Sequence, residues 1–420
     1  MKIAYLNPGG AIGGAEMCLL DVLSSLRTAR PDATPVVLLG AGGPLQAEVE
    51  ALGIPCEVLP LPGGVARLGD AGATNLGRKL VLMGRALASA RVTFAYARRL
   101  ARWIRATRPD LVQTNGMKMH LLGTWATPRA VPVVWHLHDY LGTRPAMARL
   151  LRMVTQTGVE SVAVSHSVAA DAMKTLSERM PIRVIHNGVD VDRFSPGEGD
   201  PAALDRAAGL VPATGPVVRV GLVATFATWK GHDVFLEAVS RIPADRPARF
   251  FIVGGPIYES SGSQVTLDDL KRRAAALGVA GRVGFTGYQA DPAQALRSLD
   301  VVVHASTRPE PFGRVIVEGM ACGRAVVAMS EGGAAELFRP GEDALGCAPR
   351  DPSALAGVIM RLIDDPPLRR RLGESARQAV LCRFDRTRLA LEWTSVYDRA
   401  ASPALPRSRS APFAGQPVAL

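Results

Sequence analysis

The stretch Glu310-Pro311-Phe312-Gly313-Arg314-Val315-Ile316-Val317-Glu318 stands between two short apolar runs. Residues 301–303 are three valines and residues 325–328 read Ala-Val-Val-Ala, and both runs are typical of buried strands. Gly323 is typical of a helix end. The pattern therefore predicts a strand, a loop, a helix and a second strand, with one glutamate in the loop and the other inside the helix.

The start of this predicted helix favours an anionic ligand. Pro311 suits the first helical position, where a missing N–H costs nothing. The N–H groups of Phe312, Gly313 and Arg314 would then point out of the helix toward an anion, which can approach Gly313 closely. Glu318 would lie roughly 12 Å along the axis from the first acid, a span that fits a diphosphate with a hydroxylated ring at each end. For two acids alone, a capped helix with one charged side chain facing water is the simpler interpretation.

Length and composition limit the class of protein. The chain has 420 residues, which is too many for one hydrophobic core and suits two domains, and its 48% hydrophobic and 21% charged residues indicate a globular protein. The five cysteines form no paired motif, so the sequence indicates neither zinc nor a disulfide framework and favours a reducing cytosol. The first residues do not read as a secretory signal, and no apolar run of about twenty residues predicts a membrane span.

Predicted strands alternate with predicted helices in both halves of the chain. Two such series indicate two doubly wound parallel sheets, separated by a segment rich in Pro, Gly and Asp at residues 187–216. Ligands of such sheets bind beyond the carboxyl ends of the strands, so two facing sheets predict one deep cleft. The strands are expected at residues 2–6, 35–39, 111–114, 132–137, 161–164 and 183–185, and then at 217–224, 249–253, 282–285, 301–303 and 325–328.

Four further motifs accompany the glutamate pair. They are Gly13-Gly14-Ala15-Glu16, the segment Val184-Ile185-His186-Asn187-Gly188-Val189-Asp190 with Arg193-Phe194, Trp229-Lys230-Gly231-His232-Asp233, and Gly332-Gly333 with Glu336. Each motif alone is weak. In this order, and together with the two glutamates, they resemble the retaining glycosyltransferases of family 4, which have the GT-B fold.

The resemblance implies an α/β protein of the GT-B type, with two Rossmann-like domains facing each other across a cleft. Residues 1–190 would form the acceptor-binding domain and residues 191–385 the domain that binds the nucleotide sugar. A helix at 386–401 would cross back to the N-terminal domain. The tail at 402–420 is rich in Pro, Ser and Arg and is expected to be disordered.

The resemblance also implies roles for individual residues. The predicted catalytic residues are Glu310, which would hold hydroxyls of the donor sugar, His138 in the cleft near that sugar, and Lys230 on the diphosphate. Glu318 would hold the ribose. The full set of predicted donor-binding residues is Gly13, Gly14, Thr225, Phe312, Gly313, Arg314 and Glu318.

One position departs from the family pattern. Family members usually carry a Gly-Arg pair five to six residues before the lysine, and that arginine contacts the diphosphate. Ala224 and Thr225 stand there in this chain, so one expected cation is missing. Arg314, in the predicted helix start, is the candidate replacement.

Several of these residues also have ordinary interpretations. Lys230 taken by itself is a surface lysine, and Gly13-Gly14 is a plain turn. His136 and His138 are two residues apart in a strand and therefore share a face. No further ligand cluster supports a metal site there. A purely structural role is the alternative for both histidines, above all for His136. His120 and His304 are weaker candidates, and His304 is expected to line the cleft without chemistry.

A basic segment accounts for much of the net charge of +11. Residues 61–110 hold ten Arg or Lys and two Asp, densest from Arg78 to Arg108, where apolar residues recur as in one or two amphipathic helices. Such a helix can lie on an anionic membrane surface, at the inner face for a cytoplasmic protein. A solvated arginine-rich helix face explains the pattern equally well. Nucleic acid is not expected as a partner, since few aromatic residues and no nucleic-acid module are present.

The sequence thus predicts a retaining, metal-independent glycosyltransferase without cofactors. It would move a sugar from a nucleotide-diphosphate sugar, a UDP- or GDP-sugar, to the hydroxyl of a sugar, polysaccharide or lipid-linked acceptor. The alternatives are a non-catalytic sugar-nucleotide-binding or scaffold protein, kept open by the departure at Thr225, and a nucleotide-sugar epimerase or a phosphorylase of the same fold.

Overall fold

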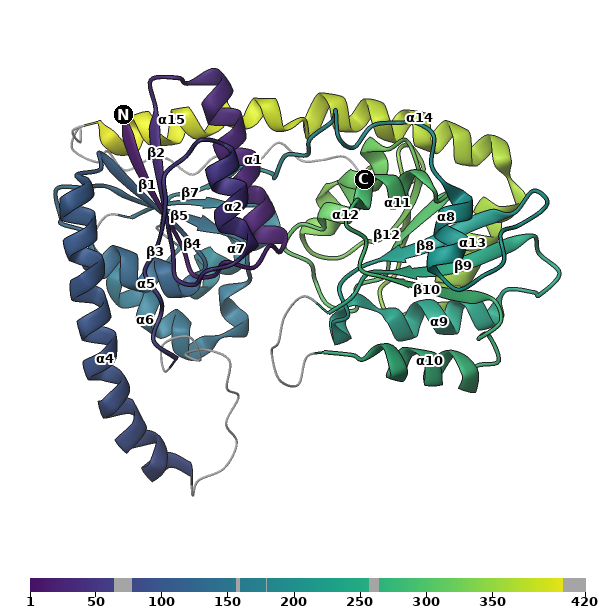
Figure 1. The fold of residues 1–420 in the computed structure, drawn as a ribbon, viewed down its shortest axis with the longest axis horizontal. Helices are drawn as coiled ribbons and strands as arrows, with labels where there is room; N and C mark the ends of the chain where they lie inside the picture. Colours follow the sequence, from purple (N-terminus) through teal and green to yellow (C-terminus); the bar gives the residue numbers. More distant parts are fainter. Residues whose placement is uncertain (64–77, 156–158, 179, 257–263, 403–420) are drawn as a thin grey trace.

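The computed structural model describes residues 1–63, 78–155, 159–178, 180–256 and 264–402. Two parallel sheets with helices on both faces lie side by side in the molecule (Figure 1). This arrangement confirms the predicted α/β class with two doubly wound domains. Residues 403–420 of the predicted tail lie outside the described residues.

The N-terminal domain contains a seven-stranded sheet in the order β3-β2-β1-β4-β5-β6-β7. Ile3 and Tyr5 of β1 pack against α1 and α15, and Ala4 and Leu6 face the opposite core with α4 and α5, as the two-residue period of a strand requires. The elements are β1 (Lys2–Asn7), α1 (Gly14–Ala29), β2 (Thr34–Leu39), α2 (Pro44–Ala51), β3 (Cys56–Val58), α4 (Arg78–Thr107), β4 (Leu111–Asn115), α5 (Met117–Ala126), β5 (Val133–Leu137), the short helix η1 (Leu141–Thr143), α6 (Pro145–Thr155), β6 (Glu160–Ala163), α7 (His166–Thr175) and β7 (Ile182–Val184).

The C-terminal domain contains a six-stranded sheet in the order β10-β9-β8-β11-β12-β13. Val301 and Val303 of β11 pack with α9 and α13, whereas Val302 faces α12, so the three valines are buried on both faces of the sheet. The elements are α8 (Pro201–Ala207), β8 (Val218–Val223), η2 (Thr228–Lys230), α9 (His232–Arg241), β9 (Ala248–Val253), α10 (Leu267–Ala276), β10 (Val283–Gly287), α11 (Pro292–Arg297), β11 (Val301–His304), α12 (Arg314–Ala321), β12 (Ala325–Met329), η3 (Gly333–Glu336), β13 (Leu345–Cys347), α13 (Pro352–Asp364) and α14 (Pro366–Arg383).

Two strands are absent from the sequence-based prediction. β3 and β13 have three residues each and lie at sheet edges. Such short runs carry no readable two-residue alternation. The edge strand β7 has the same length, but it was predicted.

Two segments connect the domains. Arg377 of α14 donates to the carbonyl oxygens of Val191, Phe194 and Ala321, which ties the linker to the C-terminal domain. After η4 (Arg386–Arg388), helix α15 (Leu389–Ala401) packs on α1 along the N-terminal domain (Figure 1). The buried Tyr397 of α15 contacts Tyr5 Oη at 3.1 Å and donates to Gln113 Oε1 at 2.6 Å.

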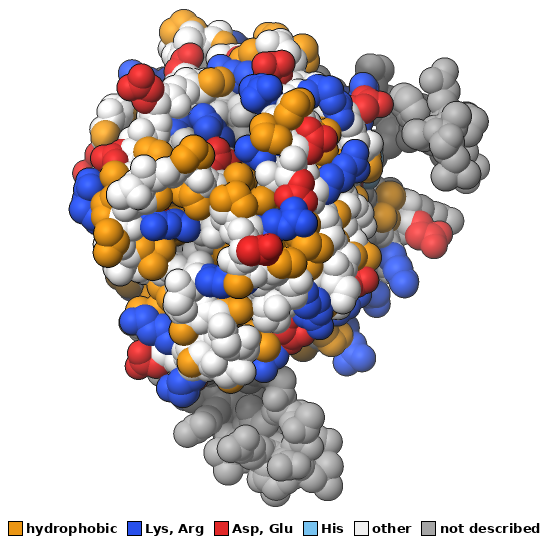
Figure 2. Space-filling view, turned by 90° about the vertical axis from the view of Figure 1, so that its right-hand side faces the viewer, with side chains coloured by type: hydrophobic (Ala, Val, Ile, Leu, Met, Phe, Trp, Pro, Cys, Tyr) orange, Lys and Arg blue, Asp and Glu red, His pale blue; other side chains and the backbone are white. Residues whose placement is uncertain are grey.

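The basic segment forms one helix over Arg78–Thr107. In its described part, Tyr96, Leu100 and Ile104 are buried and Arg98 and Arg102 are exposed, as an amphipathic helix requires. The surface of the C-terminal domain that Figure 2 shows has no such concentration of one charge, because basic and acidic side chains are interspersed on it. No helix of the described residues combines the length and apolarity that crossing a bilayer demands.

Candidate active site

The three predicted catalytic residues follow the carboxyl ends of parallel strands. Lys230 follows β8, Glu310 follows β11 and His138 follows β5 of the other domain. Tyr140, two residues after His138, donates from Oη to the carbonyl oxygen of Glu310 at 3.0 Å. The loops after β5 and β11 therefore meet, which places the candidate residues of both domains around one site.

Glu310 is the centre of a compact polar cluster. Its Oε1 accepts a hydrogen bond from Lys230 Nζ at 2.5 Å and one from Ser306 Oγ at 2.6 Å. The Glu310 side chain is only 9% exposed and the Lys230 side chain 23% exposed. The structure thus joins two residues that lie 80 positions apart in the sequence into one partly buried ion pair.

The surroundings keep this carboxylate ionised. Burial raises the pKa of Glu310, but the Lys230 ammonium and the neighbouring His304 outweigh burial and hold that pKa well below its usual range. A carboxylate that stays charged in a half-enclosed site is a strong hydrogen-bond acceptor for ligand hydroxyls.

A glycine turn fixes the position of Lys230. Gly231, between η2 and α9, has φ +75°, and a side chain there would place its Cβ 1.8 Å from the carbonyl oxygen of Ala305. Only glycine fits this conformation and this close approach. The Lys-Gly sequence therefore brings the backbone of Lys230 close to the loop that follows β11, with the ammonium at the end of a flexible stem.

The helix after Glu310 begins later than predicted. α12 begins at Arg314, with Gly313 as its N-cap at φ +100° and ψ +61°, so the expectation that Pro311 is the first helical residue is wrong. The physical reason is that Glu310 is held away from the helix by a bridge to Gly332, in which its carbonyl oxygen accepts from Gly333 N at 2.8 Å. The chain needs the left-handed Gly313 to turn from this bridge into the helix.

Arg314 joins the two domains. Its Nη1 donates to Asp21 Oδ2 of α1 at 2.7 Å and its Nε to Glu318 Oε1 at 3.2 Å. The side chains of Arg314 and Asp21 are 11% and 3% exposed, so this is a nearly buried ion pair. Its Nη2 makes no hydrogen bond to another described residue, which leaves one N–H₂ group for a ligand. Burial raises the pKa of Glu318 and Arg314 partly offsets this.

His138 lies near the same guanidinium. Burial, and then the charge of Arg314, lower the pKa of His138 to about 3, so its imidazole is neutral at physiological pH. The rings of His136 and His138 are 3.9 Å apart, as expected for neighbours on one face, and His136 packs on Trp393 of α15. His136 is thus in the core between sheet and helix.

The remaining predicted donor-binding residues occupy varied environments. A Cβ added at Gly14 would meet nothing within 4 Å, whereas Gly13 caps α1 and its N–H donates to Glu16 Oε2 at 3.1 Å. Thr225 donates from Oγ1 to the carbonyl oxygen of Gly255 at 3.1 Å. Phe312 is 3% exposed and packs against Phe384, so its ring belongs to the core.

Glu336 makes a second polar contact between the domains. Its carboxylate accepts from the backbone N–H groups of His166 and Ser167 at the start of α7, at 2.9 and 2.8 Å, and from His186 Nε2 at 2.9 Å. His166, His186 and Glu336 bring three possible metal-ligand atoms within 4.8 Å of one another. However, both carboxylate oxygens already accept hydrogen bonds at a helix N-terminus, an environment that favours an anion over a cation.

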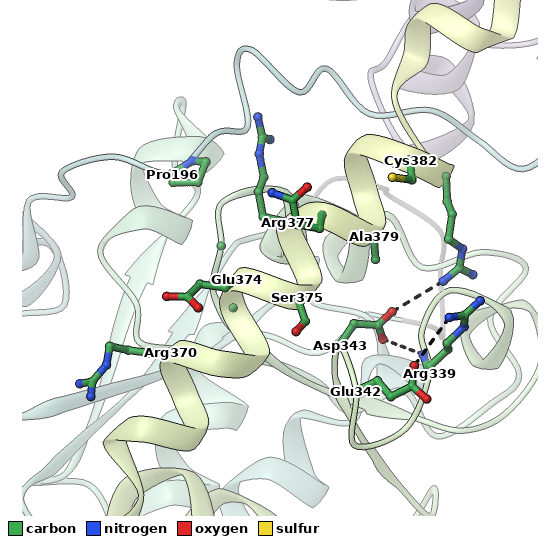
Figure 3. A pocket seen from close by; sticks show the side chains of 14 residues that line it. Pro196, Arg339, Glu342, Asp343, Arg370, Glu374, Ser375, Arg377, Ala379 and Cys382 are labelled. Carbon is green, nitrogen blue, oxygen red and sulfur yellow. Dashed lines mark hydrogen bonds and ion pairs between the residues drawn. The ribbon is translucent and has the colours of Figure 1, made fainter.

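A separate hollow of about 900 Å³ lies along α14 (Figure 3). Arg377, Glu374 and Cys382 line it, and its Asp343 accepts from Arg339 N at 2.6 Å. None of the predicted catalytic or donor-binding residues lines this hollow, so it is distinct from the candidate active site.

Sequence reasoning missed several residues of the site, among them Ser306, Tyr140 and Asp21. Asp21 carried a readable signal, because it interrupts the buried face of α1, on which Cys18 and Val22 also lie. A charged residue on an apolar helix face indicates a buried partner. Ser306 and Tyr140 lie in loops, where no periodicity shows which way a side chain points.

Comparison with protein families agrees with this geometry. Residues 12–193 match the model described as Glycosyltransferase Family 4, and residues 216–379 match the model Glycosyl transferases group 1. Together the two models cover every strand of the two sheets except β1.

Similar proteins carry related names. Over 217 residues the chain is 34% identical to the lipopolysaccharide core biosynthesis glycosyltransferase LpsE of Rhizobium meliloti (strain 1021), covering 52% of this chain and 58% of LpsE. Over 272 residues it is 25% identical to the N-acetyl-alpha-D-glucosaminyl L-malate synthase of Bacillus anthracis, covering 64% of this chain and 68% of that protein. The matched stretches thus span between about half and two thirds of these relatives.

The crystal structure of HepE from Anabaena in complex with UDP superimposes with a TM-score of 0.77 and 26% identity, covering 95% of this chain and 100% of HepE. The fold is therefore GT-B, as the motifs predicted. With both halves matched in order and the fold shared along the whole length, the chain belongs to the group 1 glycosyltransferases of family 4.

Proposed function

We propose that this protein transfers a sugar from a nucleoside diphosphate sugar, a UDP- or GDP-sugar, to an acceptor hydroxyl in the synthesis of a polysaccharide or glycolipid. The transfer would retain the anomeric configuration and would need neither a divalent metal nor a cofactor.

The observation that supports the proposal best is the Lys230–Glu310 pair at the carboxyl ends of β8 and β11. A mobile ammonium next to a fixed carboxylate suits a ligand that has phosphates at one side and hydroxyls at the other. Solved structures of HepE contain UDP and UDP-glucose, and LpsE is named for lipopolysaccharide core synthesis. These ligands and this pathway are properties of the relatives, and they point to the same substrate class here.

The proposed mechanism uses these residues for electrostatic stabilisation. As the bond between the anomeric carbon and the diphosphate oxygen breaks, negative charge grows on the phosphate and Lys230 stabilises it. The acceptor oxygen forms the new bond on the same face, and its proton passes to the departing phosphate. Glu310 holds the sugar hydroxyls, so no covalent nucleophile is required.

The direct test is nucleotide binding followed by product analysis. UDP, GDP or ADP should raise the melting temperature of the purified protein, and the corresponding sugar nucleotide should then yield free nucleoside diphosphate together with a glycosylated acceptor. A scaffold protein would bind without releasing nucleoside diphosphate, and an epimerase would change the sugar without glycosylating an acceptor. Failure of all three nucleotides to bind would contradict the proposal.

Arg314 remains our proposed substitute for the cation missing at Thr225. Replacing Arg314 with Ala should weaken nucleoside diphosphate binding by about 10- to 100-fold, since hydrogen bonds to charged groups contribute about 1.5–3 kcal/mol. Asp21→Ala is the matched control, because it breaks the same interdomain ion pair and leaves the guanidinium in place. It should lower thermal stability, as removal of one partner of a buried pair does, while nucleotide affinity is kept.

Calorimetric titration of both variants with UDP measures their nucleotide affinities. Equal losses of affinity in Arg314→Ala and Asp21→Ala would assign Arg314 to domain contact alone, and unchanged affinity in Arg314→Ala would exclude it from the diphosphate site.

We further propose that the protein acts in the cytoplasm at the inner face of the membrane through residues 78–108. Phe94 and Trp125 are 51% and 54% exposed, their ring centroids are 6.0 Å apart, and exposed Arg98 and Arg105 lie beside them around a shallow hollow. Exposed aromatic rings framed by arginines suit the interface of an anionic bilayer.

The protein should cosediment with vesicles containing phosphatidylglycerol and not with pure phosphatidylcholine vesicles. Equal sedimentation with both would contradict the proposal.

A further inference from the structure

His304, the last residue of β11, is a buried histidine without a hydrogen-bond partner. It is 4% exposed, and neither Nδ1 nor Nε2 hydrogen-bonds to another described residue. A neutral imidazole always carries one N–H donor, and a buried donor without an acceptor destabilises the fold. Such a group is unexpected in a position that serves packing alone.

The carboxylate of the candidate site lies close to this ring. His304 Nε2 lies 3.8 Å from Glu310 Oε1, just beyond hydrogen-bond distance. The direction of the ring follows from the strand, since His304 shares its face of β11 with Val302, the face that α12 covers. A buried strand holds the imidazole rigidly in place.

Glu310 Oε1 is occupied by two other donors in this structure, Lys230 Nζ and Ser306 Oγ. The function proposed above requires the Lys230 ammonium to contact the diphosphate. When Lys230 moves toward phosphate oxygens, Oε1 loses its cation and keeps only Ser306. The carboxylate then needs a further donor to stay in position and ionised.

We infer that His304 is a positioning residue for Glu310: its Nε2–H donates to Oε1 when a sugar nucleotide draws Lys230 away and the carboxylate shifts toward the fixed ring. His304 itself touches neither the sugar nor the reacting atoms. This inference rests on the proposed function, and it replaces the expectation that His304 only lines the cleft.

Two amide substitutions separate this role from packing. Gln carries its N–H₂ group at the distance of the imidazole Nε2, whereas the shorter Asn reaches only the Nδ1 position. His304→Gln should keep kcat within about threefold of wild type. His304→Asn and the apolar His304→Leu should lower kcat by about 10- to 100-fold, the value of one hydrogen bond to a charged group.

Binding of UDP alone provides the readout that a structural role would not share. UDP has no sugar for Glu310 to hold, so its affinity should stay within about threefold in all three variants while kcat for the UDP-sugar differs among them. Melting temperatures identify any variant that is merely unfolded.

The outcomes are distinguishable. Equal kcat in His304→Gln and His304→Asn, or a wild-type kcat in His304→Leu, would overturn the role of His304. A parallel loss of UDP affinity and kcat in every variant would do the same, since it indicates general disruption. If the wild-type protein neither binds UDP, GDP or ADP nor turns over their sugars, the proposed function itself fails, and that result is visible before any variant is made.

Discussion

Glu310→Gln is expected to fold like the wild-type protein and to lose at least about 100-fold in kcat. Gln has nearly the same shape, so the bridge to Gly332 and the packing of the loop should persist. The amide is neutral, however, and charge-assisted hydrogen bonds are roughly twice as strong as neutral ones. Both the hold on the sugar hydroxyls and the attraction for Lys230 weaken together.

The measurement is steady-state release of nucleoside diphosphate in the presence of acceptor, with circular dichroism to verify folding. Glu342→Gln is the matched control, because the Glu342 side chain is 69% exposed in the same domain and its carboxylate pairs with Arg339 at the surface. Sugar transfer at a normal rate by Glu310→Gln would show that the assigned role is wrong.

Lys230→Met should have the second large effect, a loss of about 10²–10³-fold in kcat/KM, comparable to the loss of one donor that stabilises a developing negative charge. Met keeps the length of the side chain and removes only the ammonium. Lys271→Met, at an exposed position of α10, is the matched control and should leave kcat/KM unchanged.

The same variant should change the pH dependence of stability. In the wild-type protein, Lys230 and His304 hold the pKa of Glu310 below its unfolded value. The ionised carboxylate therefore stabilises the fold above the unfolded pKa, and this contribution is lost as the pH falls through the folded pKa. Without the ammonium, burial raises the pKa of Glu310, so the variant should gain stability relative to wild type as the pH falls from 7 to 5.

Thermal unfolding at pH 7 and pH 5 measures this difference. Identical pH dependence in Lys230→Met and wild type would mean that the ion pair does not control the ionisation of Glu310.

The order of the elements was readable from the sequence because their signals are local. A run such as Val301–Val303 is apolar over its whole length, and the glycine and proline residues that follow such runs mark the ends of elements. Three residues are too few to show a period: of the three edge strands of this length, β7 was predicted and β3 and β13 were missed. The start of α12 was misplaced because a proline suits a first helical turn, and only the bridge between Glu310 and Gly332 keeps Pro311 out of the helix.

Hydrophobic periodicity and chain direction were enough to predict the two-sheet architecture and the placement of Lys230, Glu310 and His138 after strand ends. Which of these groups touch became visible only in the folded molecule. There Lys230 meets Glu310, Arg314 reaches Asp21 in the other domain, and His304 lies 3.8 Å from Glu310 without a hydrogen bond. The physical reason is range. Hydrophobic periodicity is set by neighbours a few residues away in the sequence. An ion pair, in contrast, depends on distances of a few ångströms between side chains that are far apart in the sequence. These side chains come together only when the cores of both domains have formed.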